Sequence, residues 1–175
     1  CYPFIDPAKI HVVYNGINQR IDATVDSGSA LTVTDLTVKA QNHNLVVPIA
    51  GAISVAAGDH LAIGANVTLG FIDTKVEAAV NDGATVTATG NVQVLAGNRS
   101  DITSVAASLA ISTGSFAAAG SAASMNVDDD VRAFVDGTVH TTGNVYIDAD
   151  ETTRSVIVAG GLGGGDSGVG LSVTN

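Results

Sequence analysis

Self-similarity at a spacing of 55 residues is the feature that most limits what this chain can fold into. Three segments share an alternation of small apolar and polar residues, followed by a glycine-containing break and a second alternating run. Their first residues, Ile21, Val76 and Val131, are 55 positions apart along the 175-residue chain. A repeat of this length is typical of proteins in which one supersecondary unit recurs and packs on its neighbours.

The pattern inside each segment predicts β-strands. Val92, Val94 and Ala96 alternate with other residues at period two, which places them on one face of a strand. Hydrophobic residues make up 46% of the chain but aromatic residues only 4%, so the core must be built from Val and Ala. Because β-branched and small residues suit closely stacked strands, we expect about four strands per unit and almost no helix.

Three arrangements of repeated β units compete. Three blades are too few to close a propeller, and independent sandwich modules need roughly 100 residues each. The sequence therefore predicts an all-β fold, a parallel β-solenoid (β-helix) in which equivalent residues stack on neighbouring strands. Ile21, Val76 and Val131 would form one internal ladder, and a second ladder would contain Val38, Val94 and Ile147.

The expected boundaries follow the repeat. Residues 1–9 do not match the pattern and form an N-terminal cap or the edge of a fragment, and the units span about 10–64, 65–119 and 120–175. The sequence leaves open whether each unit is one wide coil or several narrow ones, and one wide coil is favoured. The runs Ser104–Ile111 and Gly120–Val127 would then form an antiparallel hairpin that extends from the coil.

Charge and composition exclude several partners. The net charge is −10 and only seven Lys and Arg residues are present, which argues against nucleic acid because phosphate binding depends on such residues. No apolar run approaches the roughly 20 residues that a membrane-spanning helix needs, so we expect no membrane insertion. The single cysteine, Cys1, rules out a disulfide within the chain.

One family resemblance rests on these repeats. The order Ser-Val-Ala, a Gly-rich break, Asn-Val-Asp, Val-x-Ala-x-Val-x-Asp-Gly and Gly-Asn-Val-x-Val-x-Ala resembles repeats of large bacterial filamentous adhesins, the haemagglutinin-like and leukotoxin-like surface exoproteins. It covers nearly the whole chain after about Lys9. The resemblance implies a secreted or surface-displayed fibre, located outside the cell or on the bacterial surface. Its partners would be neighbouring repeats or like subunits and an unidentified host or cell-surface ligand.

The densest acidic cluster is a candidate metal site. Asp128, Asp129 and Asp130 are consecutive, and Asp73 aligns with them one repeat earlier. Calcium takes six to eight oxygen ligands, so this cluster is the one candidate cation site, and no other cofactor is expected. The alternative interpretation is an exposed turn that keeps a solenoid corner soluble. A second column of carboxylates is expected in the Asp-Gly turns, at Asp26, Asp82 and Asp136.

No catalytic constellation is complete in the sequence. The glycine-rich stretch at 160–166 lacks the Lys-Ser/Thr pair of a phosphate loop and is expected to be a small-residue face or a turn. Asp148, Asp150 and Glu151 are carboxylates of the type that β-helix polysaccharide lyases and hydrolases use, but no basic residue accompanies them. We therefore expect a structural and adhesive protein that is not an enzyme. The alternatives are a filament subunit that stacks head to tail, and a carbohydrate-active β-helix enzyme.

Overall fold

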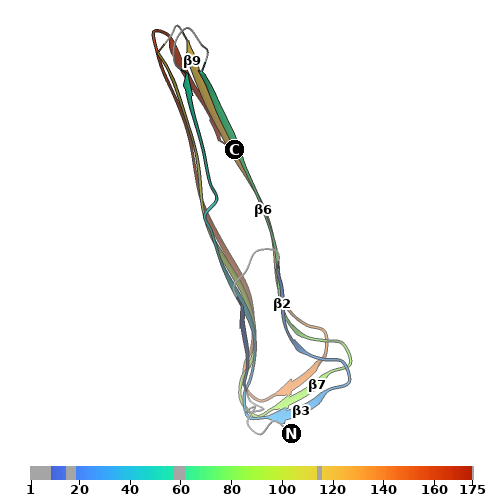
Figure 1. Cartoon of the computed structure of the whole chain (residues 1–175). Helices are drawn as coiled ribbons and strands as arrows, with labels where there is room; N and C mark the ends of the chain where they lie inside the picture. Colours follow the sequence, from blue (N-terminus) through green and yellow to red (C-terminus); the bar gives the residue numbers. More distant parts are fainter. Residues whose placement is uncertain (1–8, 15–18, 57–61, 114–115, 175) are drawn as a thin grey trace. The chain divides into compact units, whose positions relative to one another are not determined.

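The computed structural model describes residues 9–14, 19–56, 62–113 and 116–174, and β-strands are the regular elements of these ranges (Figure 1). The prediction of an all-β chain is confirmed for them. No long apolar helix that could cross a membrane occurs among these residues.

The strands form three sheets. One has the order β1 (Lys9–Tyr14), β4 (Leu36–Val46), β8 (Val92–Ser112) and β11 (Val145–Gly164), with β5 (Ile49–Ala56) also paired to β8. The second has the order β12 (Gly168–Thr174), β9 (Ala117–Val135), β6 (Ala62–Val80) and β2 (Gln19–Val25). The third contains β10 (Thr138–Thr141), β7 (Thr85–Ala88) and β3 (Ala30–Val33).

The register of these sheets matches the spacing of the sequence pattern. Ile21 on β2 pairs in parallel with Val76 on β6, as predicted. On the third sheet, Thr85 pairs with Ala30 on one side and with Thr138 on the other. Paired strands are therefore separated by a whole repeat length of chain. The exception is β1, where Lys9 pairs with Thr37.

The predicted antiparallel hairpin is wrong. Residues 104–111 belong to β8, and residues 120–127 belong to β9. These two strands lie in different sheets, and each is hydrogen-bonded to its equivalent in the neighbouring copy of the pattern. Period-two alternation predicts a strand but not its partner, and pairing with the equivalent strand matches the apolar positions of both.

The chain divides into two compact units built from discontinuous segments. Unit 1 contains residues 1–44, 73–100 and 128–153, and unit 2 contains 45–72, 101–127 and 154–175. The division cuts across the predicted repeats 10–64, 65–119 and 120–175, because each of them contributes segments to both units.

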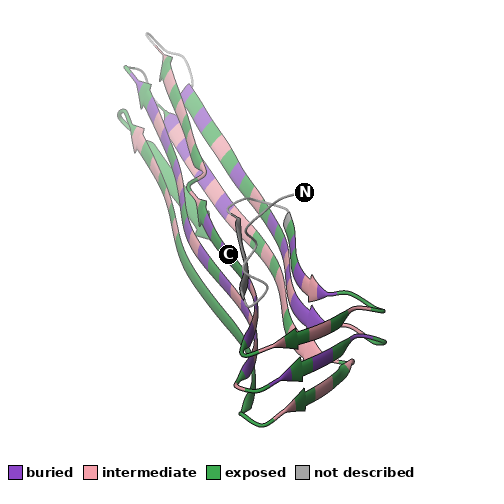
Figure 2. Ribbon diagram, turned by 90° about the horizontal axis from the view of Figure 1, so that it is seen from below, coloured by how far each residue is buried: buried purple, intermediate pink, exposed green. Residues whose placement is uncertain are grey.

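Unit 1 has its core between the inner faces of three sheets. Buried and exposed residues alternate along the strands (Figure 2). The middle copy of the pattern is the most buried, and both Val92 and Val94 are 0% exposed. Their counterparts in the last copy, Val145 and Ile147, are 48% and 47% exposed. A residue of the middle copy is covered by a neighbouring strand on each side, whereas β11 ends its sheet.

Unit 2 buries mostly small side chains, together with Ile72 and Ile102. Ala62, Ala110, Ala117 and Ala119 form its buried cluster. The glycine-rich stretch continues this theme, because a Cβ added at Gly161 would lie 2.8 Å from the carbonyl oxygens of Ala119 and Leu171. The expectation of a small-residue face is confirmed for the part of this stretch within β11.

Asx side chains hold one corner of unit 1. Oδ1 of Asp35 accepts a hydrogen bond of 2.6 Å from the backbone N–H of Asn91. Oδ1 of Asn91 in turn accepts one of 3.0 Å from the N–H of Asn144. Each side chain therefore satisfies a backbone donor of the neighbouring copy, at a position that the strand ladder does not reach.

The second corner, between the second and third sheets, corrects the predicted carboxylate column. Val25 pairs with Val80, so Asp26 is followed on the neighbouring strand by Asn81 and not by Asp82. The N–H of Asp136 donates to the oxygen of Val80, which places Asp136 next to Asn81 as well. The uncharged amide thus separates two carboxylates that would otherwise repel.

Candidate functional site: a buried polar network around Asp129

The three consecutive aspartates lie within strand β9, in the part that has β6 as its sheet neighbour, because β12 pairs only with residues 117–123 of β9. Their interpretation as an exposed corner is therefore wrong. Successive side chains of a strand point to opposite faces, so Asp128 and Asp130 share one face and Asp129 occupies the other. Asp128, Asp129 and Asp130 do not converge on one point, and no group of three His, Cys, Asp or Glu residues among the described ones is placed to hold a metal.

Asp129 points toward the sheet that contains β8 and β11. Its Oδ2 accepts a hydrogen bond of 3.1 Å from the hydroxyl of Ser100. The hydroxyl of Thr153 lies 3.4 Å from the same oxygen and equally close to Oε1 of Glu151, and it can donate to one of the two. Its Oδ1 is buried and has no hydrogen-bond partner. Hydroxyl groups of two adjacent strands of the opposite sheet thus surround one oxygen of this carboxylate, and its other oxygen remains available as an acceptor.

Ser100 connects Asp129 to a larger polar network. The amide of Asn98 donates a hydrogen bond of 3.3 Å to the Ser100 hydroxyl and accepts one of 3.0 Å from Asn42. The amide of Asn44 lies 3.5 Å from the Ser100 hydroxyl and donates to the Thr74 hydroxyl at 2.9 Å. Asn42, Asn44, Asn98, Ser100 and Thr74 are all buried.

The strand register produces this network. Leu36 donates its N–H to the oxygen of Asn91, which sets β4 against β8 with equivalent positions 56 residues apart. Asn42 then lies beside Asn98, and Asn44 beside Ser100. Side-chain amides stacked in this way hydrogen-bond along the sheet, as in other stacked parallel strands.

Sequence reasoning missed this site, although a signal was present. The inward positions of β4 continue from Val38 and Ala40 to Asn42 and Asn44 without a change of period. The alternation therefore already places two amides inside. Buried polar side chains are the informative exceptions in a core, and a search for acidic clusters alone does not find them.

The chemistry available here is that of oxygen acceptors. Oδ1 of Asn42, Asn44 and Asp129 is buried without a partner in each case. Such oxygens accept hydrogen bonds from water or coordinate hard cations. The calcium prediction stays untested, and of its three aspartates only Asp129 faces these oxygens.

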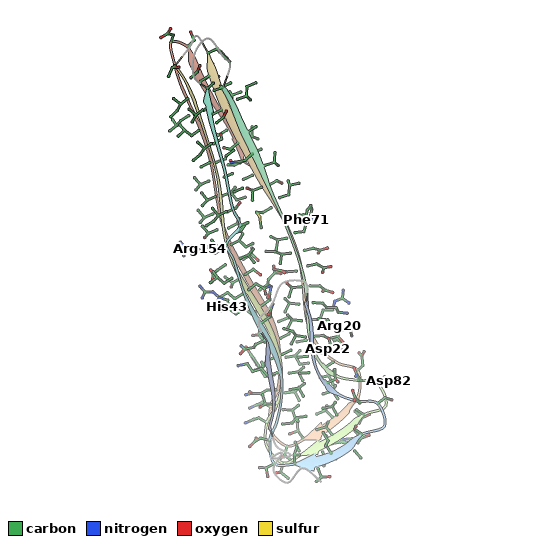
Figure 3. The ribbon with its side chains drawn as sticks, viewed as in Figure 1. Arg20, Asp22, His43, Phe71, Asp82 and Arg154 are labelled. Carbon is green, nitrogen blue, oxygen red and sulfur yellow. The ribbon has the colours of Figure 1, made fainter. Side chains whose placement is uncertain are left out.

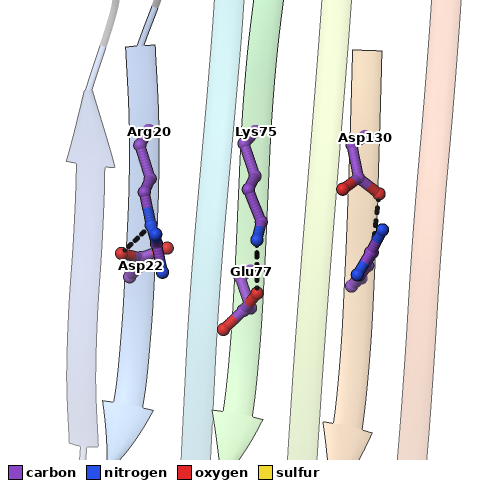
Figure 4. Close-up of polar contacts among 6 residues, drawn as sticks. Arg20, Asp22, Lys75, Glu77 and Asp130 are labelled. Atoms are coloured by element: carbon purple, nitrogen blue, oxygen red, sulfur yellow. Dashed lines mark hydrogen bonds and ion pairs between the residues drawn. The ribbon is translucent and has the colours of Figure 1, made fainter.

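Asp130 is part of a charged ladder on the outer face of the second sheet (Figure 4). Three ion pairs, each between residues two positions apart, join Arg20 to Asp22, Lys75 to Glu77 and Arg132 to Asp130, with N–O distances of 2.6, 3.2 and 2.8 Å. The order of charges is reversed in the third pair. Lys75 therefore has Arg20 on one neighbouring strand and Asp130 on the other, since β6 lies between β2 and β9.

A shallow notch lies on the outer side of the first sheet in unit 1. Its volume is about 270 Å³, and it is lined by Gln41, Asn42, His43, Gly97, Asn98, Arg99 and Asp150. Gly97 lacks a side chain between its neighbours on β4 and β11, which accounts for the depression. Of the other carboxylates considered in the sequence, Asp148 shares the face of Asp150, whereas Glu151 points to the opposite face, and all three are exposed.

Comparison of the chain with protein-family models, with curated proteins and with solved structures gives no significant match.

Proposed function

We propose that this chain is a structural and adhesive segment of a secreted or surface-displayed bacterial fibre. In this proposal the three copies of the sequence pattern are successive wide coils of a parallel β-solenoid. The stacked coils act as a stiff spacer, and their outer faces and corners contact a ligand. The family resemblance of the repeats supports the location and the adhesive role.

One observation carries the structural part of the proposal. Ile21 pairs with Val76 in parallel and in register, so residues at the same phase of the pattern are hydrogen-bonded neighbours. A strand stack of this kind places backbone hydrogen bonds along the axis of repetition, where every coil supports the next. Extension along that axis must break all the hydrogen bonds of a ladder together, so the stack resists stretching, as a spacer must.

Single-molecule pulling from the two chain ends tests the spacer. We expect the coils to detach one at a time, each releasing roughly 190 Å of chain, because a repeat of about 55 residues extends by about 3.5 Å per residue. Rupture in one step without intermediate lengths would contradict a stack of separable coils. The Val76→Asp variant serves as the control, because a charge in the core should remove the force peaks.

Adhesion is tested separately. Surfaces coated with the chain should retain candidate host or bacterial cells under flow, and surfaces coated with the Val76→Asp variant should not. Equal retention on both surfaces would overturn the adhesive role and leave the pulling result unaffected.

A second candidate function is a subunit that stacks head to tail. The observation that favours it is the exposure of Val145 and Ile147, whose counterparts Val92 and Val94 are fully buried under a further strand. The first coil of another molecule would cover them in the same way. Electron microscopy of the concentrated chain should then show filaments, and an Ile147→Lys variant should remain monomeric under the same conditions.

A further inference from the structure

The outer side of β5, β8 and β11 in unit 2 carries large aliphatic side chains at alternating positions. We call these residues the apolar face: Ile49, Ile53 and Val55 on β5; Val105, Leu109 and Ile111 on β8; Val156, Val158 and Leu162 on β11. Ile53 is 78% exposed and Leu162 is 72% exposed. Phe71 on β6, which is also exposed, shows the same outward placement of a large side chain on the other sheet (Figure 3).

Apart from Ile72 and Ile102, the buried apolar side chains among the described residues of unit 2 are alanines, so side-chain size is distributed in the opposite way to an ordinary core. Alanines occupy the buried cluster, whereas the isoleucines and leucines of the apolar face are outside. The hydrophobic effect favours removal of these large side chains from water, at about 25 cal/mol for each Å² of apolar surface. Contiguous exposed patches of this kind mark interaction sites in soluble proteins.

Charge restricts the kind of partner. No Asp, Glu, Lys or Arg occurs within β5, within residues 102–112 of β8 or within residues 155–164 of β11. Among the described residues of unit 2, the charged ones are Asp101, Arg154 and Asp166. Most of the charge that gives the chain its net −10 therefore lies in unit 1, and it does not oppose contact between two copies of the apolar face.

The face has a relief that fits a copy of itself. Ile49 pairs with Val105, Gly51 with Ala107, and Ile53 with Leu109. The N–H of Val92 donates to the oxygen of Asn144, and the same register sets Val158, Gly160 and Leu162 beside Val105, Ala107 and Leu109. Gly51, Ala107 and Gly160 thus form a furrow across the strands. It lies between one ridge of Ile49, Val105 and Val158 and another of Ile53, Leu109 and Leu162.

Two-fold symmetry brings a ridge of each copy into the furrow of the other. Side chains on one face of a strand recur at every second residue, so the furrow and each neighbouring ridge are about 6.6 Å apart along the strands. An axis parallel to the rows and midway between the furrow and the Leu109 ridge exchanges the two. The contact is then isologous, and side chains interdigitate as they do between stacked sheets.

The available area is sufficient for such a contact. The seven most exposed members are Ile49, Ile53, Val55, Ile111, Val156, Val158 and Leu162. At roughly 70–150 Å² each they present on the order of 800 Å², about one partner's side of a standard protein interface.

We propose that the apolar face is a lateral interface at which a second copy of this chain packs face to face, ridge into furrow. This interface differs from head-to-tail stacking, which uses the open edges of the coils. It would join solenoids side by side, and it does not depend on the adhesive role of the chain.

Sedimentation velocity on the full chain, over a range of concentrations, tests the proposal. We expect a reversible dimer of the wild-type chain. The Ile53→Lys/Leu162→Lys variant should weaken association at least tenfold, because it places two charges in the ridge. The Ala107→Leu variant should do the same by filling the furrow with a side chain that points to solvent in the monomer.

The controls separate this interface from other contacts. Thr87→Lys adds a charge at an exposed position of β7 in unit 1, outside the apolar face, and should leave the dimer intact, and circular dichroism should show the wild-type fold in every variant. A wild-type chain that stays monomeric at 100 μM or above would overturn the proposal. Unchanged association of the Ile53→Lys/Leu162→Lys variant would overturn it too, as would a monomer that floats with neutral phosphatidylcholine vesicles, since lipid would then be the occupant.

Discussion

The hydroxyl of Ser100 on β8 donates a hydrogen bond of 3.1 Å to Oδ2 of Asp129 on β9, and so joins strands of two different sheets through polar side chains. Toward the beginning of β4 and β8 the interior of unit 1 is filled mainly by valine and alanine, whereas around Ser100 it is polar. Removal of this contact therefore tests whether buried polar groups stabilise the stacked strands.

Removal of the Ser100 hydroxyl should destabilise the chain. In Ser100→Ala, Asp129 keeps only the 3.4 Å contact with the Thr153 hydroxyl, for which Glu151 competes, and the amides of Asn44 and Asn98 lose a partner. A buried polar group left without its partner costs about 1–3 kcal/mol. Urea denaturation should show a loss in this range for Ser100→Ala. Thr103→Ala, on the exposed side of the same strand, should change the free energy of unfolding by less than about 0.5 kcal/mol. Equal effects of the two substitutions would contradict the network.

The charged ladder predicts a difference between pairing along a strand and across strands. Arg132→Glu removes the pair with Asp130 and puts a carboxylate beside Glu77, which already has Asp22 on its other side. We expect a loss of about 0.5–1 kcal/mol that shrinks in high salt, since the side chains of Arg132 and Asp130 are 59% and 40% exposed.

The double variant Asp130→Lys/Arg132→Glu separates the two contributions. It restores the pair within β9 but gives Lys75 like charges on both neighbouring strands. Stability equal to wild type would show that only the pairing within a strand matters, whereas stability equal to Arg132→Glu alone would show that the cross-strand neighbours dominate.

The same Val→Ala substitution should have different effects on stability in a central strand and in the last strand of a sheet. Val92 and Val145 are neighbours across β8 and β11, with exposures of 0% and 48%. Val92→Ala should cost about 2 kcal/mol through lost burial and a cavity, and Val145→Ala less than half of that. Thermal and urea unfolding of the two variants provide the comparison. A larger loss at Val145 would mean that another molecule covers the last strand in solution.

Two adjacent glycines of β11 should respond in opposite ways to a methyl group. A Cβ at Gly161 would lie 2.8 Å from two carbonyl oxygens of other strands, whereas one at Gly160 has nothing within 4 Å. Gly161→Ala should lose about 1–3 kcal/mol by overpacking, and hydrogen exchange should accelerate in β12. Gly160→Ala should be neutral or slightly stabilising, because alanine loses less backbone freedom on folding. Faster exchange in the Gly160 variant alone would contradict this packing.

Spacing made the strand pairing predictable. Equivalent residues such as Ile21 and Val76 align in the sequence at the distance at which they pair, because parallel strands in register bring equal phases together. The partner sheet of a strand was not predictable in this way. Residues 104–111 and 120–127 are neighbours in sequence with matching patterns, and only the competition with their equivalents in other copies places them in different sheets.

The site was harder to predict because charge is a poor guide to what lies inside a strand stack. Asp128, Asp129 and Asp130 look equivalent in sequence, yet alternation sends only Asp129 inward. Ser100 comes from the preceding copy, and Thr153 comes from a later strand of the same copy. The site can be predicted only if the pairing register of all three copies is known. The corners differ slightly in length between copies, and these differences shift the register that the sequence alone suggests.

Those length differences are tolerated at one corner in particular. Four residues, 81–84, connect β6 to β7, whereas only residues 136 and 137 connect β9 to β10, and yet β10 pairs with β7 in register. A change in chain length at this corner therefore leaves the strand pairing on either side unchanged. It is a natural insertion point, at which a foreign peptide of several residues would be displayed on the surface while the strands keep their partners.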